Sequence, residues 1–234
     1  MQVVILSGGK GTRLYPLTKT IPKCLVSILD KPFFTYQIEL LKKNNIFDIV
    51  LCVGTFSEQI INEYGDGKKY GVSIRYSLEE PDNLLGTGGA LKNASELLND
   101  SFFVMYGDSY LPIDFAKVCD AFKNSNKKAL MTIYKNKNEF DKSNVSISGD
   151  LVTKYDKSDN KGLEYIDYGL LVLKKQVLEI IPSDKFVNLD LLIQMLIVSK
   201  ELRSFIVNTR FYEIGSNEGI SDFTNYIKSL ANSK

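Results

Sequence analysis

The first half of the chain alternates short apolar runs with segments whose apolar residues recur at helical spacing. Residues 3–6 form a β-branched apolar run typical of a buried strand, and Phe34, Ile38 and Leu41 have the spacing of one helix face. The same criteria predict strands at 46–53, 72–76 and 102–106, and helices at 33–43, 58–64 and 89–98. Strands separated by helices indicate right-handed crossovers and a mostly parallel sheet that is covered on both faces.

From residue 130 the pattern becomes β-rich, with polar turns between short apolar segments. It predicts strands at 130–134, 144–147, 152–155 and 168–173, followed by helices at 189–198 and 219–230. No repeat, low-complexity tract or linker separates the two parts, so we expect them to share one sheet. The expected fold is a single α/β domain over residues 1–234, with a Rossmann-like, mixed, mostly parallel sheet flanked by helices. Residues 1–110 would form a nucleotide-binding half, and the β-rich residues 111–234 an acceptor-binding half.

Composition excludes several classes of function. The chain has 234 residues, enough for a hydrophobic core without disulfides or a structural metal, and its net charge of +1 creates no general attraction for nucleic acid or an anionic membrane. The three cysteines are scattered and form no CxxC pair, which fits a reducing compartment. The sequence also shows no leader and no apolar span of membrane length, so we expect a cytoplasmic protein. The sequence contains no histidine, which excludes Ser/His/Asp and Cys/His triads and histidine metal sites.

A glycine-rich segment, Ser7–Arg13 (SGGKGTR), follows the first predicted strand. It has neither the P-loop spacing nor the GxGxxG spacing of dinucleotide-binding proteins. Its glycines would let backbone amides approach an anion closely, while Lys10 and Arg13 add positive charge. An ordinary tight turn with solvated basic side chains explains the segment equally well when it is considered alone.

The segment continues into three further motifs, so that the first 32 residues contain GGKGTRL at 8–14, YPLT at 15–18, IPK at 21–23 and DKP at 30–32. Together they resemble the GGxGTRLxPLT…PK…xKP signature of sugar-1-phosphate nucleotidyltransferases. The resemblance extends along essentially the whole chain, through LGTGGA at 85–90, GDS at 107–109, DK at 156–157 and FYEIGS at 211–216. The similar enzymes include heptose- and mannose-1-phosphate guanylyltransferases.

The resemblance implies four groups of site residues. Nucleotide-binding residues would be Leu6, Gly8, Gly9, Lys10, Gly11, Thr12, Arg13, Glu80, Gly86, Thr87 and Gly107. Catalytic cations would be Arg13, Lys23 and Lys157. The sugar phosphate would be bound by Asn144, Asp156, Lys157, Tyr168 and Gly169. Asp108 and Glu213 would hold Mg²⁺.

Several of these residues have a second interpretation. Asp108 follows a predicted strand, where ligands of open α/β sheets bind, but an aspartate there also forms turns. Glu213 could be a solvated loop acid, and many relatives carry aspartate at its position. Lys23 and Lys157 could be surface lysines. Asn144 replaces a glycine of several relatives, and its side chain would either contact the sugar or cap a turn.

The implied reaction transfers a nucleoside monophosphate from an NTP to a sugar 1-phosphate and releases pyrophosphate, in the service of polysaccharide synthesis. A sugar 1-phosphate is largely dianionic at pH 7, so no histidine base is required, and direct displacement can proceed through positioning, cations and metal. Glu79 and Glu80 precede the loop expected beside the base. A carboxylate there could accept two hydrogens from guanine, which favours GTP; CTP is the nearest alternative, followed by UTP and thymidine triphosphate.

Two other classes of function are less consistent with the sequence. A glycosyltransferase would usually carry a DxD motif, whereas Asp108 is followed by Ser109 and Tyr110. A catalytically silent regulatory subunit would not need Arg13 together with the lysines and Asp108. Apolar residues on the later helices could form a homodimer contact, although core packing explains the same residues.

Overall fold

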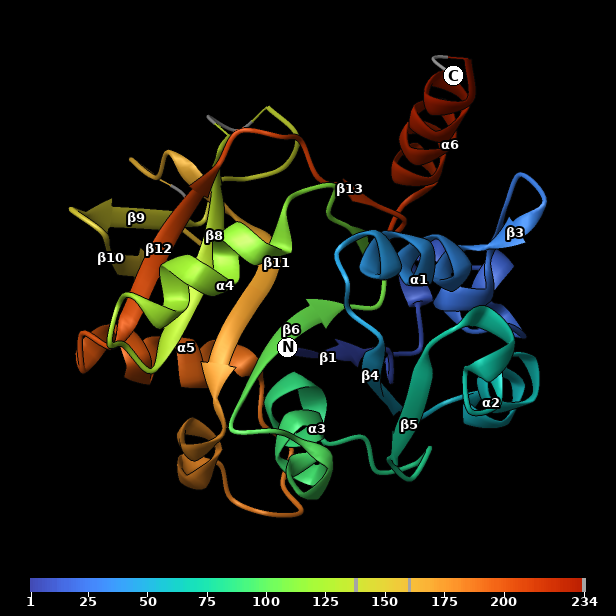
Figure 1. Ribbon diagram of the computed structural model, residues 1–234, viewed down its shortest axis with the longest axis horizontal. Helices are drawn as coiled ribbons and strands as arrows, with labels where there is room; N and C mark the ends of the chain where they lie inside the picture. Colours follow the sequence, from blue (N-terminus) through green and yellow to red (C-terminus); the bar gives the residue numbers. More distant parts are fainter. Residues whose placement is uncertain (137–138, 160, 233–234) are drawn as a thin grey trace.

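The computed structural model describes residues 1–136, 139–159 and 161–232. Its centre is a nine-stranded sheet with the order β5-β4-β1-β6-β11-β8-β12-β10-β9 (Figure 1). The strands are β1 (Gln2–Leu6), β4 (Asp48–Val53), β5 (Ser73–Leu78), β6 (Ser101–Tyr106), β8 (Ala129–Lys135), β9 (Val145–Ser148), β10 (Leu151–Tyr155), β11 (Tyr165–Lys174) and β12 (Leu202–Val207). Short pairs are formed by β2 (Ser27–Ile28) with β3 (Lys31–Pro32), and by β7 (Ser109–Tyr110) with β13 (Tyr212–Glu213).

Strand direction confirms the predicted mixed, mostly parallel sheet. The strands β5, β4, β1 and β6 are parallel neighbours, and β12 is parallel to β8. β11 lies between β6 and β8 and is antiparallel to both, which continues the sheet of the first half into the second. The expectation that the two halves share one sheet is therefore also confirmed.

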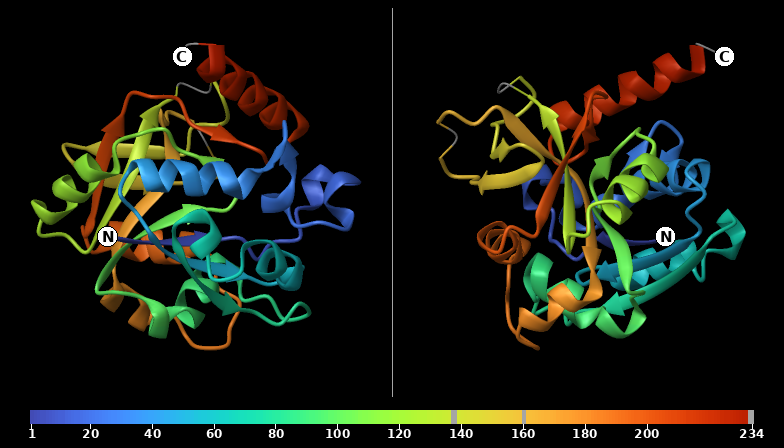
Figure 2. Two further views of the ribbon diagram at one scale, coloured as in Figure 1. Left: turned by 45° about the vertical axis from the view of Figure 1, so that its right-hand side comes forward. Right: turned by 60° about the vertical axis from the view of Figure 1, so that its left-hand side comes forward.

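Helices cover both faces of the sheet (Figures 1 and 2). The α-helices are α1 (Phe33–Lys43), α2 (Ser57–Tyr64), α3 (Gly86–Asn93), α4 (Phe115–Lys123), α5 (Leu189–Val198) and α6 (Asn217–Asn232). Short 3₁₀ turns lie at Thr12–Leu14, Leu17–Lys19, Lys23–Leu25, Lys68–Tyr70, Ser95–Leu97 and Lys175–Ile180. Successive residues of a strand point to opposite faces, so Val3 and Ile5 join the core under α1, α2 and α4, whereas Val4 and Leu6 join the core under α3 and α5.

The last helix, α6, packs outside these two layers. Phe223 of α6 is fully buried and makes edge contacts with Phe33 and Tyr36 of α1, at ring centroid distances of 5.1 and 5.5 Å. Tyr110 of β7 lies 4.9 Å from the same ring. This small core fixes the segment that carries β13 against β7, next to the end of β6.

Among the longer elements, α4 and β12 were not predicted from the sequence, although α4 had a clear signal. In α4, Phe115, Val118 and Phe122 are buried at helical spacing, and the side chain of Asp114 caps the first turn. Strand β12 contains the polar pair Arg203 and Ser204, and it is recognised only through its parallel pairing with β8.

The helix predicted at 89–98 begins and ends earlier, at Gly86 and Asn93. Glycine disfavours helix by about 1 kcal/mol relative to alanine, so the sequence favoured a later start. A Cβ on Gly89 would come within 2.7 Å of the carbonyl oxygen of Lys185, and one on Gly88 within 3.1 Å of that of Val187. Close packing against this neighbouring segment overrides local propensity.

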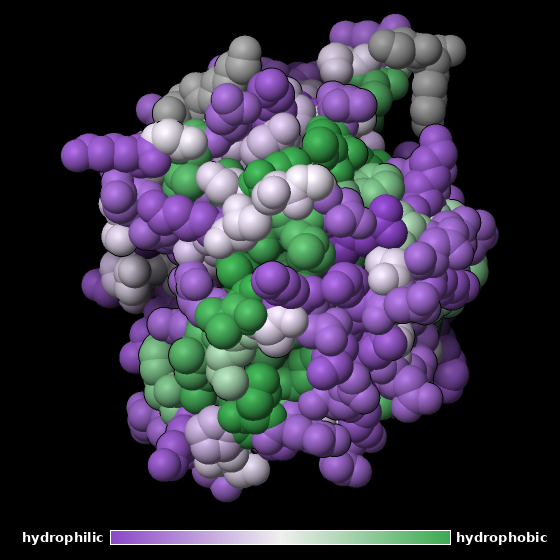
Figure 3. Space-filling view, turned by 90° about the vertical axis from the view of Figure 1, so that its left-hand side faces the viewer, coloured by the Kyte–Doolittle hydropathy of each residue, from purple (hydrophilic) through white to green (hydrophobic). Residues whose placement is uncertain are grey.

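The face at the left of Figure 1 carries a band of apolar side chains (Figure 3). Separately, α5 exposes Leu191, Met195 and Val198, at spacings that place them on one side of the helix. A homodimer stays a prediction.

Within the described residues, no helix combines the length and apolarity needed to cross a membrane.

Candidate active site

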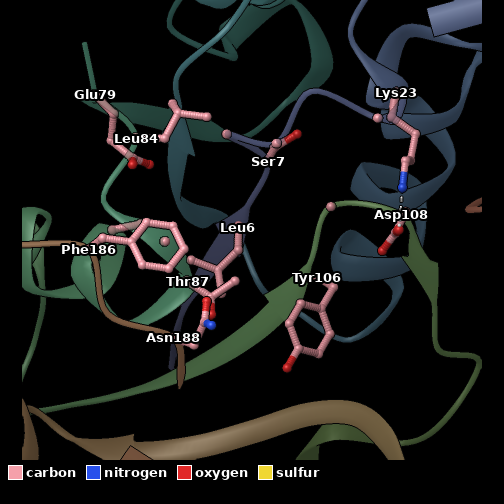
Figure 4. Close-up of a pocket in the computed structure, with 16 residues that line it drawn as sticks. Leu6, Ser7, Lys23, Glu79, Leu84, Thr87, Tyr106, Asp108, Phe186 and Asn188 are labelled. Carbon is pink, nitrogen blue, oxygen red and sulfur yellow. Dashed lines mark hydrogen bonds and ion pairs between the residues drawn. The ribbon is translucent and has the colours of Figure 1, made fainter. Parts of the chain in front are cut away.

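A cavity of about 330 Å³ opens at the carboxyl ends of β1 and β6, where open α/β sheets bind ligands (Figure 4). It is lined by Leu6, Ser7, Gly8, Gly9, Gly11, Lys23, Glu79, Leu84, Gly86, Thr87, Ala90, Tyr106, Gly107, Asp108, Phe186 and Asn188. Glu79, Leu84 and Phe186 lie toward one end, and Lys23 with Asp108 at the other (Figure 4). The cavity therefore has an apolar end with one buried acid and a separate charged end.

The glycine-rich loop forms one wall of the cavity. A Cβ on Gly8 would lie 2.9 Å from Oε1 of Glu79, and Gly11 has a φ of 63°, so both positions favour glycine. The hydroxyl of Thr18 donates a hydrogen bond of 2.7 Å to the carbonyl of Gly11 and fastens the loop. The side chains of Lys10, Thr12 and Arg13 are exposed and do not line the cavity.

The charged end is built around an ion pair. Lys23 Nζ lies 2.8 Å from Asp108 Oδ2, and both side chains are about four-fifths buried, with 17% and 22% of their surface exposed. Asp108 comes directly after β6 and Gly107, where a Cβ would lie 2.8 Å from the carbonyl oxygen of Leu6. The close approach of β1 and β6 at this glycine places the ion pair beside the glycine-rich loop.

Glu213 lies beside this ion pair. The β7–β13 pairing places Glu213 opposite Ser109, and the amide of Ile214 donates a 2.9 Å hydrogen bond to the carbonyl of Asp108. Glu213 Oε2 accepts a 2.7 Å hydrogen bond from the amide of Gly215. The structure thus brings together the two carboxylates that the sequence predicted to share a metal.

Electrostatics at Glu213 fit a cation site. Burial raises the pKa of Glu213, the charge of Asp108 raises it further, and Arg13 and Lys23 act in the opposite direction. Two partly desolvated carboxylates that repel each other are the donor set that Mg²⁺ uses when waters and substrate phosphates complete its shell. The described residues contain no group of three or more cysteine or acidic side chains arranged for a metal, and a Mg²⁺ site formed by Asp108 and Glu213 stays a prediction.

At the other end, Glu79 rather than Glu80 faces the cavity. Only 8% of Glu79 is exposed, burial raises the pKa of its carboxyl group, and its Oε2 accepts a 2.7 Å hydrogen bond from the amide of Leu85. Glu80 is exposed and is absent from the cavity lining, which corrects the position chosen from the sequence.

The wall opposite the glycine-rich loop is formed by two segments distant in sequence. The amides of Gly88 and Gly89 donate to the carbonyl of Val187, at 2.8 and 3.1 Å, and the amide of Leu189 donates a 2.8 Å bond to the hydroxyl of Thr87. These bonds hold Phe186 and Asn188 at the cavity. Sequence reasoning missed both, because no local pattern before α5 marks them. It also missed Ser7, Leu84, Ala90 and Tyr106, all of which adjoin or lie within recognised motifs.

The structure places the predicted sugar-phosphate residues in two regions, an exposed turn that contains Asp156 and Lys157 and a buried frame that contains the others. Lys157 Nζ lies 2.9 Å from Asp190 Oδ1 and 5.4 Å from the ring centre of Tyr155. Asp156 does not project into the cavity lining; its carboxylate accepts hydrogen bonds from Ser158 and Asp159. These bonds lower the pKa of Asp156 to about 2 and build the exposed turn that carries Lys157.

Asn144, Tyr168 and Gly169 belong to the frame beneath this region. Asn144 Oδ1 accepts a 2.8 Å bond from the amide of Asp167, and Gly169, with a φ of 98°, donates to Asp167 Oδ1 in an irregular part of β11. Tyr168 is 1% exposed and packs against Phe211. Alternation along β11 sends Tyr168 into the core under α4, so the structure does not place it at the cavity, contrary to the sequence prediction.

Comparison with known proteins decides the family. The family model described as nucleotidyl transferase matches residues 2–185, which include the glycine-rich loop, Lys23, Asp108 and Lys157. The chain belongs to the nucleotidyl transferase family.

This nucleotidyl transferase has relatives that act on sugar phosphates. It is 31% identical over 225 residues to D-glycero-alpha-D-manno-heptose 1-phosphate guanylyltransferase of Campylobacter jejuni, which covers 95% of this chain and 98% of that protein. It is 33% identical over 243 residues to mannose-1-phosphate guanyltransferase of Saccharomyces cerevisiae, covering 99% of this chain and 66% of that protein. Its fold resembles the crystal structure of HddC from Yersinia pseudotuberculosis complexed with GMP-PN, with a TM-score of 0.78, 26% identity, and coverage of 97% and 99%. The resemblance inferred from the motifs is confirmed, and the chain is a sugar-1-phosphate nucleotidyltransferase.

Proposed function

We propose that this nucleotidyl transferase moves a GMP group from GTP to a heptose or hexose 1-phosphate, with Mg²⁺, and releases pyrophosphate. The observation that carries the proposal is the two-ended cavity. Its apolar end, with buried Glu79, suits a base that has hydrogen-bond donors, and its charged end, with Lys23 and Asp108, suits phosphates. The resulting GDP-sugar would serve polysaccharide synthesis.

The preference for GTP rests on Glu79. Oε2 accepts the hydrogen bond from the amide of Leu85, and Oε1 lies close to Gly8, 2.9 Å from where a Cβ on that residue would be. The edge of guanine presents a ring N–H and an amino group, both of which can donate to a carboxylate, whereas uracil presents one donor between two acceptors. The names of the relatives from C. jejuni and S. cerevisiae, both guanylyl enzymes, support the same base. Cytosine, with its amino donor, is the nearest rival.

In the proposed reaction, the chain's own residues bind, orient and neutralise. Amides of the glycine-rich loop and the side chain of Arg13 would bind the nucleotide phosphates, and Lys157 would bind the phosphate of the acceptor. An oxygen of the sugar phosphate forms a bond to the α-phosphorus while the bond to the β-phosphate oxygen breaks, so pyrophosphate leaves and no proton has to be removed first. Lys23, which pairs with Asp108 in this structure, would then stabilise charge on the reacting phosphates.

Mg²⁺ bound by Asp108 and Glu213 would supply further positive charge for the phosphates. Both residues lie on or next to the paired strands β7 and β13, so their backbones are neighbours, and the charge of Asp108 raises the pKa of Glu213. A single domain over residues 1–234 and a cytoplasmic location stay predictions.

A matrix of nucleoside triphosphates against hexose and heptose 1-phosphates, scored by pyrophosphate release, tests the proposal. GTP is expected to give the highest kcat/KM with at least one acceptor, and a reaction without enzyme serves as the blank. Highest activity with UTP or CTP would refute the choice of base. Absence of sugar-dependent pyrophosphate release with every pair would refute the proposed reaction itself.

A further inference from the structure

Lys157 is a long side chain on an exposed turn, yet its ammonium group has a defined partner. The turn is held mainly by its own contacts, the hydrogen bonds to Asp156, and 52% of the Lys157 side chain is exposed. Lysine keeps considerable rotamer freedom at such a site, so a point charge offered to a phosphate would be spread over many positions. Among the described residues, Asp190 is the carboxylate within ion-pair distance of Lys157, at 2.9 Å.

Asp190, in contrast, sits on a firmly bonded part of the chain. It lies in the first turn of α5, directly after Leu189, whose amide is bonded to the hydroxyl of Thr87. Val187, three residues earlier, donates to the carbonyl of Leu85 and accepts from the amides of the helix α3 glycines. The backbone that carries Asp190 is therefore bonded to the wall of the nucleotide cavity, and it can act as a fixed anchor for a mobile lysine.

The surroundings place this ion pair next to the cavity. Asn188, two residues before Asp190, lines the cavity, and so does Thr87, whose hydroxyl accepts the hydrogen bond from the amide of Leu189. The ammonium of Lys157 lies 5.4 Å from the ring centre of Tyr155, and the hydroxyl of Tyr155 donates a 3.5 Å hydrogen bond to Asp167. An ammonium has three donors, so one bond to Asp190 leaves two for a phosphate.

We propose that Asp190 is a positioning residue, which holds the ammonium of Lys157 beside the cavity in the place where it meets the phosphate of the sugar 1-phosphate. This rests on the proposed function, in which Lys157 binds the acceptor. Asp190 acts through Lys157 and makes no contact with the nucleotide. The ion pair with Lys157 neutralises the Asp190 carboxylate, which reduces its repulsion of an incoming phosphate.

Steady-state kinetics of four variants test the proposal: Asp190→Asn, Asp190→Glu, Lys157→Met, and Lys157→Met combined with Asp190→Asn. Asp190→Asn should raise the KM for the sugar 1-phosphate about three- to fivefold, the range of an exposed ion pair, with the KM for the NTP within twofold of wild type. Asp190→Glu should restore part of the loss. In the Lys157→Met background, Asp190→Asn should have no further effect on the KM.

Glu39→Gln is the matched control, because Glu39 forms a similarly exposed ion pair with Lys31 away from the cavity, at 2.6 Å. It should leave both KM values unchanged, and thermal unfolding should show that all variants fold. An unchanged or lowered KM for the sugar 1-phosphate in Asp190→Asn would overturn the proposal. The same rise in the Lys157→Met background would overturn it as well, since Asp190 would then act without the lysine.

Calorimetric binding of mannose 1-phosphate separates this inference from the proposed reaction. If the wild-type protein binds the sugar phosphate but releases no pyrophosphate, the reaction is refuted, and the comparison of wild type with Asp190→Asn still decides the role of Asp190. If the wild-type protein neither binds nor turns over any sugar phosphate, both proposals fail.

Discussion

Replacing Glu79 by glutamine separates base recognition from catalysis. The change removes one charged acceptor from the apolar end of the cavity and preserves side-chain shape. A hydrogen bond to a charged group contributes about 1.5 to 3 kcal/mol, so the kcat/KM for GTP should fall about 10- to 150-fold. UTP has no pair of donors for the carboxylate, and its kcat/KM should stay the same or rise.

The stability of the Glu79→Gln variant should change in the opposite sense. Burial raises the pKa of Glu79, so its protonated form is favoured by folding. That contribution to stability is fully present below the ordinary glutamate pKa and is lost as the pH rises through the raised pKa of the folded protein. At pH 7 the buried charge of Glu79 therefore lowers the stability of the folded protein. An uncharged glutamine removes this cost but weakens the hydrogen bond from the amide of Leu85, so the Tm should stay unchanged or rise.

The assay is pyrophosphate release with GTP, CTP and UTP at saturating acceptor, together with thermal unfolding between pH 4 and pH 8, the range in which glutamates titrate. Glu80→Gln is the matched control, because the neighbouring glutamate is exposed and outside the cavity. It should leave both nucleotide preference and Tm unaltered. Identical GTP to UTP ratios in the wild type and Glu79→Gln would refute the assignment of Glu79 as the base-reading residue.

Three further results are expected. Asp108→Asn and Glu213→Gln should each lower kcat by at least ~100-fold, and added Mg²⁺ should partly restore the activity of each single variant. The double variant should be barely less active than the less active single variant, and additive losses in a Mg²⁺ titration would contradict a shared ion. Lys23→Ala should fold normally but lower kcat by ~100-fold, and a change of less than about threefold in turnover would argue against a catalytic role. Gly89→Ala should lose about 1 to 3 kcal/mol in the free energy of unfolding, measured with urea, because its Cβ would lie 2.7 Å from the Leu85 side chain and from the carbonyl oxygen of Lys185; an unchanged denaturation midpoint would contradict this.

Part of the site could be located from sequence alone, because local patterns determine it. The β-branched run 3–6 is typical of a buried strand and forms one, and the glycines that follow it need no distant partner to form a tight loop. Asp108 directly follows another apolar strand, so its place at the carboxyl edge of the sheet follows from parallel strand direction. Motif resemblance added Glu213, which no local signal marked, and the β7–β13 pairing brings it to Asp108.

Other features depended on contacts between segments that are distant in the sequence. Glu79 and Glu80 are chemically identical neighbours after β5, and only the packing of Gly8 and Leu85 against one of them decided which carboxylate is buried in the cavity. Tyr168 faces the core because of the alternation of β11, which the sequence could not orient without the neighbouring strands.

The sequence by itself therefore determined the class of fold, the glycine-rich loop and the family, since these follow from periodicity and from motifs within short stretches. Tertiary structure alone decided that Phe186 and Asn188 line the cavity and that Asp190 meets Lys157. The physical reason is the backbone pairing between the α3 glycines and Val187, which joins segments about a hundred residues apart and leaves no trace in the local pattern of either.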